Sequence, residues 1–180
     1  MSKRRKRGEP DDADLRVARR GSTLLLRLHG REVQVLQWVF ADLGRMLAGE
    51  STVDSVTKRL FPRAFLDPTA EEAEAQWQEM VHDELAEIRI TALTDVLQSL
   101  DDAKERPGRD GAREIVLEPE RAERWLTVLN DARLAVGTAL DVTPEWDFAE
   151  LDPDDPTYEL HAVYAWMTEL QSALVNAVAP

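Results

Sequence analysis

The sequence predicts a mainly α-helical protein: a helical bundle around one long central helix, with a small antiparallel β element made of an N-terminal hairpin and a short strand near 113–117. Three observations predict this class. Apolar residues recur at three- and four-residue spacings in several segments. The segment from Thr69 to Arg106 contains neither glycine nor proline, and the short apolar runs are bounded by turn residues.

A basic tail precedes a single helical domain. The tail holds an uninterrupted basic run, Lys3, Arg4, Arg5, Lys6 and Arg7, and has no apolar periodicity, so we expect residues 1–14 to be disordered. The remaining residues, 15–180, are enough to bury roughly 70% of the surface that the unfolded chain exposes. We therefore expect one domain that folds without a metal or a disulfide.

The first elements of the domain are a hairpin and a helix. Residues 15–19 and 22–28 flank a turn at Gly21, and the second run is apolar and bounded by glycine, which predicts two antiparallel strands. From Arg31 onward the apolar spacing becomes helical, and Gly49 is placed to end the helix.

Two further helices follow, the second of them long. Ser51 and Asp54 resemble a capping box, which predicts a short helix that Pro62 ends. Thr69 with Glu72 predicts a second capping box at the start of the long helix. The apolar stripe of that helix is broad, which predicts a central helix with neighbours on more than one side. Its main members are Trp77, Met80, Val81, Leu85, Ile88, Ala92, Val96 and Leu100.

The C-terminal third contains a strand and two amphipathic helices. Residues 113–117 follow a turn-rich linker and predict the third strand. Pro119 predicts the first residue of a helix whose apolar periodicity continues toward Pro144. The same periodicity over 160–178 predicts the final helix.

Composition excludes several classes of function. The chain contains no cysteine, which excludes a disulfide, a thiolate nucleophile, a Cys-ligated zinc and a thiol redox switch within it. No run of 18 apolar residues occurs and the basic start is not followed by an apolar segment, so we expect no membrane span, no signal peptide and a cytoplasmic location.

Charge is distributed unevenly along the chain. The net charge is −13, but residues 1–20 hold eight Lys or Arg against four Asp or Glu, so the rest of the chain carries −17. An acidic body repels nucleic-acid phosphates. Any contact with nucleic acid would therefore have to come from the tail or from a local patch, and binding through so short a basic run would be weak and sensitive to salt.

No catalytic or metal-binding motif is evident. Glu79-x-x-His82 has the ligand spacing of di-iron bundles, but the second such pair that these sites need is missing. The acidic segment 146–159 lacks the glycine and the distal glutamate of a calcium loop. Serine-nucleophile, phosphate-loop and dinucleotide-binding motifs are also missing. We expect no cofactor, no metal and no enzymatic activity.

One polar cluster interrupts an apolar helix. Asn130, Asp131 and Arg133 are poor helix formers or costly to bury, so contacts with other residues must offset this cost in free energy. We expect a lock between helices, in which Arg133 pairs with an acid of the long helix (Asp83, Glu84 or Glu87) and Asn130 bonds a backbone carbonyl. A ligand site made of the same three residues is the alternative.

Most of the tryptophans lie on apolar stripes. Trp38, Trp77, Trp125 and Trp166 are therefore expected in the core. Trp146 lies outside the stripes, and we expect it to anchor its loop.

Three segments carry a resemblance to a known family. They are Arg59-Leu60-Phe61-Pro62-x-Ala64-Phe65, Trp125-Leu126-x-x-Leu129-Asn130-Asp131-x-Arg133-Leu134-x-x-Gly137-Thr138 and Tyr164-x-Trp166-x-x-x-Leu170-Gln171. Together they resemble an actinobacterial domain-of-unknown-function family that is often encoded beside the ClpS protease adaptor and is also named the AosR-type oxidative-stress regulator. The resemblance implies regulation through protein contacts. Redox sensing by paired cysteines is proposed for some members, and this chain departs from them because it has no cysteine.

These observations favour a non-enzymatic regulatory or adaptor protein that acts through contacts with another protein, in stress-response transcription. The partner's identity and a homodimer remain open. A nucleic-acid-associated transcription factor that uses the basic tail is one alternative. The other is an enzyme of uncharacterised type with a polar pocket at Asn130, Asp131 and Arg133.

Overall fold

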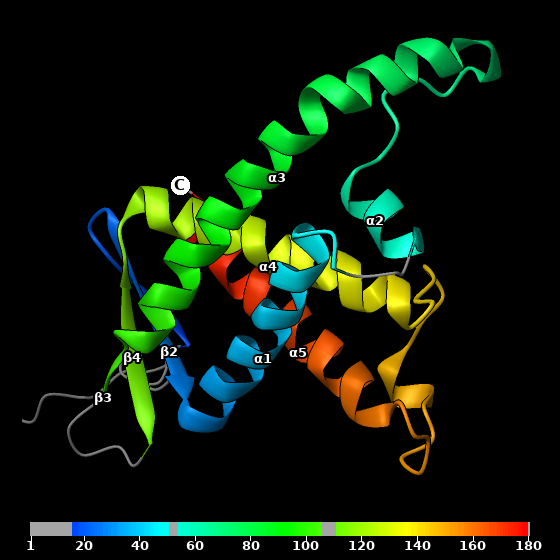
Figure 1. Cartoon of the computed structure of the whole chain (residues 1–180). Helices are drawn as coiled ribbons and strands as arrows, with labels where there is room; N and C mark the ends of the chain where they lie inside the picture. Colours follow the sequence, from blue (N-terminus) through cyan, green and yellow to red (C-terminus); the bar gives the residue numbers. More distant parts are fainter. Residues whose placement is uncertain (1–15, 51–53, 106–110, 180) are drawn as a thin grey trace, which may run out of the picture.

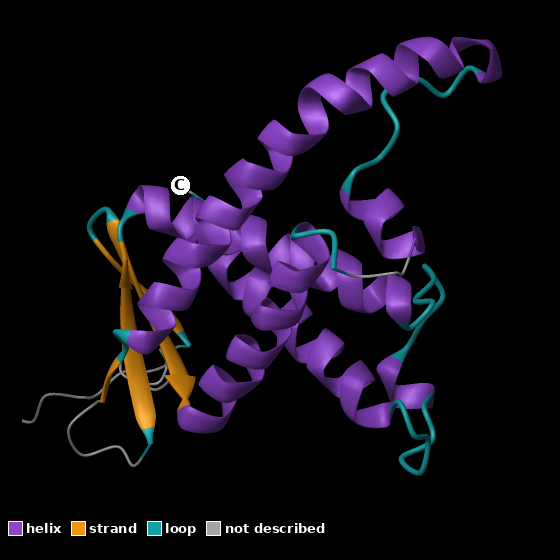
Figure 2. Cartoon of the chain, in the orientation of Figure 1, coloured by secondary structure: helices purple, strands orange, loops and turns teal. Residues whose placement is uncertain are grey.

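The computed structural model describes residues 16–50, 54–105 and 111–179, and it confirms a mainly α-helical fold with a small antiparallel sheet (Figure 1; Figure 2). In chain order the elements are β1 (Val17–Arg20), β2 (Thr23–His29), α1 (Gly30–Leu47), α2 (Asp54–Leu60), the 3-10 turn η1 (Pro68–Ala70), α3 (Glu71–Asp101), β3 (Lys104–Glu105), β4 (Ala112–Leu117), α4 (Pro119–Ala139), the 3-10 turn η2 (Phe148–Glu150) and α5 (Tyr158–Val178).

The sheet has the strand order β1-β2-β4-β3, and every pair is antiparallel. Gly21 adopts a φ of 64° in the turn between β1 and β2, a conformation that favours glycine. Leu26 of the central strand pairs with Val17 on one side and Ile115 on the other. The predicted hairpin and third strand are therefore present. The sequence did not predict β3. In the structure the long helix ends at Asp101, and the chain that follows it pairs with β4.

The helix boundaries follow from local chemistry. The backbone N–H of His29 donates to Glu32 Oε2 at 2.7 Å, so α1 begins directly after β2. Gly49 has a φ of 75° just beyond α1 and marks its end, as the sequence predicts. Pro119 is the first residue of α4, also as predicted. The predicted capping box at Ser51 lies outside the described residues.

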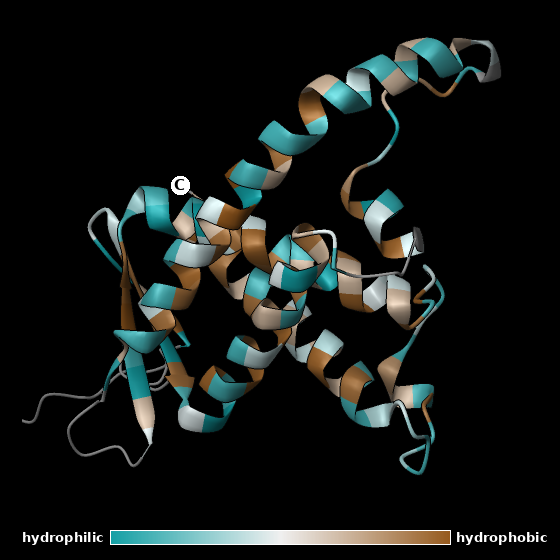
Figure 3. Ribbon diagram, viewed as in Figure 1, coloured by the Kyte–Doolittle hydropathy of each residue, from teal (hydrophilic) through white to brown (hydrophobic). Residues whose placement is uncertain are grey.

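Helix α4 lies at the centre of the core and packs against α1, α2, α3, α5 and the sheet. Trp125 is fully buried in it, with its ring edge-on to Phe40 of α1. Its indole Nε1 donates to Ser99 Oγ of α3 at 3.0 Å. Apolar residues concentrate where these helices meet (Figure 3).

Trp38 is not in the core, contrary to the sequence prediction, because its side chain is 58% exposed. Successive residues of an α-helix are rotated by about 100°. Position 38 is two residues from both Leu36 and Phe40, so it lies on roughly the opposite face of the helix from them. Leu36 and Phe40 are fully buried, and Trp38 faces outward as a result.

Trp146 anchors the segment that connects α4 to α5, as expected. Its Nε1 donates to His161 Nδ1 at 3.1 Å, and the two rings stack. Tyr164 meets the same indole edge-on. These contacts fix the acidic segment 147–157 at one end of α5.

Helix α3 has two unlike halves. Its second half contributes buried residues from Ala86 to Leu100 and packs against α1 and α4. Its first half leaves the body together with the segment that follows α2 (Figure 1). The long helix is therefore present, but α4 is the helix with neighbours on most sides.

Candidate functional site

Residues 61–88 form an extension that we name the arm: the loop after α2, the turn η1 and the first half of α3 (Figure 1). Large apolar side chains on the arm face solvent. Leu66 is 85% exposed, Met80 71%, Ile88 58% and Phe65 40%. Exposed apolar residues that gather on a projecting element are typical of an interaction surface.

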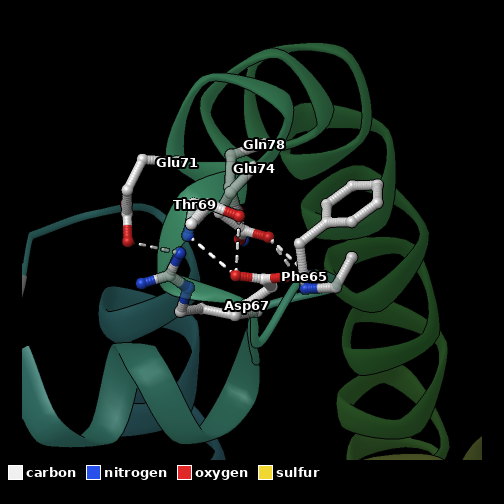
Figure 4. Close-up of polar contacts among 8 residues, drawn as sticks. Phe65, Asp67, Thr69, Glu71, Glu74 and Gln78 are labelled. Carbon is white, nitrogen blue, oxygen red and sulfur yellow. Dashed lines mark hydrogen bonds and ion pairs between the residues drawn. The ribbon is translucent and has the colours of Figure 1, made fainter.

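Glu74 holds the loop of the arm against α3 (Figure 4). The carboxylate is only 6% exposed, and its Oε2 accepts hydrogen bonds from the backbone N–H groups of Ala64 and Phe65 at 3.0 and 2.9 Å. Gln78 Nε2 donates to Oε1 at 2.7 Å. These donors, the Gln78 amide first, lower the pKa of Glu74 below its ordinary value.

Two further contacts order the turn at the tip of the arm. Arg63 pairs with Glu71 at 2.8 Å, and Asp67 Oδ1 accepts from both the backbone N–H and the hydroxyl of Thr69 (Figure 4). Asp67 is thus the N-cap of η1, with Pro68 as its first residue. The predicted capping box of Thr69 with Glu72 is wrong: no side chain caps α3, and the Thr69 hydroxyl donates to Asp67 instead.

We predict that acid loosens this loop through Glu74. A carboxylate whose folded-state pKa is lowered stabilises the fold above its ordinary pKa of 4.5, and that stability is lost as the pH falls below this value toward the folded-state pKa. Hydrogen exchange at the amides of Ala64 and Phe65 should therefore accelerate as the pH falls through this range, after correction for intrinsic rates. In Glu74→Gln the exchange should already be fast at pH 7 and should show no such step. A step that persists in Glu74→Gln would contradict the assignment.

The arm is strongly acidic. It contains eight acidic residues and one arginine, Arg63, for a net charge of −7. The acidic residues are Asp67, Glu71, Glu72, Glu74, Glu79, Asp83, Glu84 and Glu87. A surface that combines negative charge with exposed apolar side chains is complementary to a basic surface with an apolar groove.

The base of the arm contains an inter-helix contact that involves Asp131. Arg89 of α3 lies 3.6 Å from the buried Asp131 of α4, measured from Nη1 to Oδ1, and its guanidinium stacks over the ring of Phe61. The imidazole of His82 also packs against Phe61, with 4.4 Å between the two ring centroids. These four side chains connect the loop after α2 with α3 and α4 where the arm leaves the body.

Burial raises the pKa of Asp131 above its ordinary value, although the charge of Arg89 and a hydrogen bond from Asn130 act in the opposite direction. Asn130 itself is exposed. Nη1 of Arg89 is buried and has no hydrogen-bond partner among the described residues. The contact is therefore a charge pair between a buried carboxylate and a partly buried guanidinium, without good hydrogen-bond geometry.

The expected partner of Arg133 is wrong. Arg133 does not pair with Asp83, Glu84 or Glu87; its Nε donates to Thr168 Oγ1 at 3.0 Å, and Nη1 donates to Gln171 Oε1, both on α5. Positions 131 and 133 are rotated by roughly 200° on a helix, so they face different neighbours. A lock between helices exists, but it joins α4 to α3 through Asp131 and α4 to α5 through Arg133.

Sequence reasoning missed Arg89, although a signal was present: it is the one Lys or Arg within residues 71–101. It also missed Phe65 and Leu66, which lie between Pro62 and Pro68 and could have been recognised as apolar residues in a predicted loop. The basic run Lys3 to Arg7 lies outside the described residues. Within the described ranges, no group of three or more His, Asp or Glu side chains could hold a metal ion.

The fold and these sites define a mainly α-helical protein with a small antiparallel sheet and a projecting acidic arm. The chain belongs to the family described as "Domain of unknown function (DUF2017)", whose model matches residues 12–178. No curated protein and no solved structure matches it significantly. Among the described helices, none has the length and apolar character needed to cross a membrane.

Proposed function

We propose that this protein is a non-enzymatic regulatory or adaptor protein that acts through protein–protein contacts, and that the arm is its docking surface. One observation carries the proposal: the arm is internally ordered, yet it presents Leu66 and Met80 to solvent. Folding gains little from apolar side chains left in water, whereas binding can gain from burying them.

The charge of the arm indicates which kind of partner it would bind. A net charge of −7 around the exposed apolar residues favours a protein whose surface is basic around an apolar groove. Such charges mainly accelerate association, and salt weakens their effect. We therefore propose a basic protein as the partner and a complex that weakens as ionic strength rises.

A role in stress-response transcription is the finer part of the proposal. Its support is the resemblance of three sequence segments to the AosR-type oxidative-stress regulators. This chain has no cysteine, so no thiol of its own could sense an oxidant. In this role the partner, or another component of the complex, supplies the signal.

The proposal predicts that two apolar-to-glutamine changes on the arm remove binding. Leu66→Gln with Met80→Gln should abolish capture of a basic partner from native lysate while the melting temperature stays close to that of the parent, because both side chains are exposed. The control is Val175→Gln on α5, which removes a half-exposed apolar side chain far from the arm in sequence. Capture that is equal for the double variant and the parent, or a captured partner without a basic surface, would contradict the proposal.

The alternative function as a nucleic-acid-associated transcription factor depends on the five basic residues of the tail. Binding by this route requires that deletion of residues 1–14 removes it and that added salt weakens it steeply. The enzyme alternative would need a different set of residues from Asn130, Asp131 and Arg133. Asn130 is exposed, Asp131 faces α3 and Arg133 faces α5, so these three side chains do not line one pocket.

A further inference from the structure

A polar pocket of about 250 Å³ lies where α2, α4 and α5 meet, apart from the exposed apolar residues of the arm. Each of the three sequence segments that carry the family resemblance contributes to it. Its lining residues are Arg59, Arg133, Leu134, Gly137, Thr138, Asp141, Val142 and Tyr164. The pocket therefore places two arginines from different helices around one space.

Contacts with α5 hold the side chain of Arg133 in place. Its Nε and Nη1 donate to Thr168 and Gln171, and its guanidinium lies over the ring of Tyr164, 5.4 Å from the ring centroid. All three partners are neutral. Among the described residues, no carboxylate lies within ion-pair distance of Arg133, and its Nη2 has no hydrogen-bond partner. A fixed guanidinium with free donors is suited to bind an oxyanion.

Arg59 supplies a second positive charge without a counter-charge. No described residue forms an ion pair or a hydrogen bond with its side chain, although the chain carries 35 acidic residues and a net charge of −13. Two arginines that line the same pocket repel each other unless an anion lies between them. Asp141 also lines the pocket, but it forms no ion pair with either arginine.

The wall of the pocket is rigid. A Cβ atom at position 137 would lie 2.8 Å from Cε2 of Tyr164, so glycine is what allows this ring to lie against α4. Trp146 packs edge-on against the same ring. At the end of α4, the carbonyls of Gly137 and Thr138 accept from the N–H groups of Val142 and Asp141, so these carbonyls do not compete for the arginines.

We propose that this pocket binds the oxyanion, carboxylate or phosphate, of a small molecule between Arg59 and Arg133. Its volume suits a small metabolite better than a large cofactor. Nothing in the docking function of the arm requires such a site, and the pocket gives the protein a second, independent binding activity.

The test uses inorganic phosphate and succinate as separate probes at constant ionic strength, with sodium chloride as the baseline. Binding is followed by the ¹⁵N–¹H spectrum of the full chain and by the melting temperature. We expect saturable shifts for amides of residues 133–142 and a rise in melting temperature with at least one probe. The probe that binds distinguishes a phosphate ligand from a carboxylate ligand.

Arg59→Gln is the decisive variant, because this exposed side chain has no partner in the described fold and its loss should leave the fold intact. It should weaken binding by about tenfold or more. Arg45→Gln is the matched control: it removes an exposed arginine on α1, paired only with Asp42, and should bind like the parent. Absence of saturation with both probes, or equal affinity of Arg59→Gln and the parent, would overturn the proposal.

Discussion

Replacement of Trp125 by alanine is expected to lower the free energy of unfolding by about 3–5 kcal/mol, the range for a large aromatic side chain removed from a core. The indole is fully buried, contacts Phe40 edge-on and donates to Ser99. Its removal leaves a cavity and a buried hydroxyl without its donor. Because domains of this size are stable by only about 5–15 kcal/mol, urea unfolding at pH 7 should show a large shift of the midpoint.

Two milder variants separate the contributions at this site. Trp125→Phe keeps most of the apolar volume but loses the hydrogen bond to Ser99, and Ser99→Ala removes the acceptor while the ring stays. We expect each to cost about 1–3 kcal/mol, less than Trp125→Ala. If Trp125→Ala unfolds within about 1 kcal/mol of the parent, α4 is not the centre of the core.

Replacement of Arg89 by methionine is expected to cost about 3 kcal/mol at pH 7, because it leaves the carboxylate of Asp131 buried without its charge partner. Methionine preserves much of the packing on Phe61, so the loss of stability reflects mainly the missing positive charge. Asp131→Asn in the Arg89→Met background should recover part of the stability, since no buried charge then remains. Urea unfolding of the parent, both single variants and the double variant gives the coupling energy.

The same pair makes stability depend on pH in a defined direction. The folded-state pKa of Asp131 is raised above its ordinary 3.8, so the folded state binds more protons and stability falls as the pH rises from 3.8 through the raised pKa. Arg89→Met should move the upper end of this window to higher pH, and Asp131→Asn should remove this contribution. Because Glu74 contributes in the opposite direction, the contribution of Asp131 is measured as the difference in stability between each protein and the same protein with Asp131→Asn. If the stability of Arg89→Met relative to the Arg89→Met, Asp131→Asn double variant rises over this window, the assignment is contradicted.

Much of the fold follows from the sequence because the apolar periodicity and the positions of glycine and proline indicate the same helix boundaries. The apolar spacing of α1, α4 and α5, with Gly49 and Pro119 at their ends, determines helices that the structure reproduces within a few residues. Gly21 between two short apolar runs likewise predicts the hairpin.

The predictions that failed concern tertiary structure. The apolar stripe of α3 continues through Met80 and Leu85, so periodicity cannot tell that its first half leaves the body. The sequence pointed to α4 as the helix that carries the inter-helix polar contacts, but it assigned the contact with α3 to Arg133 instead of Asp131. Which of the two faces α3 depends on how α4 is rotated in the core. The two-residue strand β3 has too few residues to show a pattern.

Site-specific photo-crosslinking in native cells tests the docking role of the arm most directly. A photoreactive residue is placed at Leu66 or Met80 on the arm, and at Val116 or Val175 as exposed apolar controls elsewhere. We predict that both arm positions crosslink to the same basic protein and that neither control does. Adducts that form only at Val116 or Val175, or equally at all four positions, would contradict the arm as the docking surface.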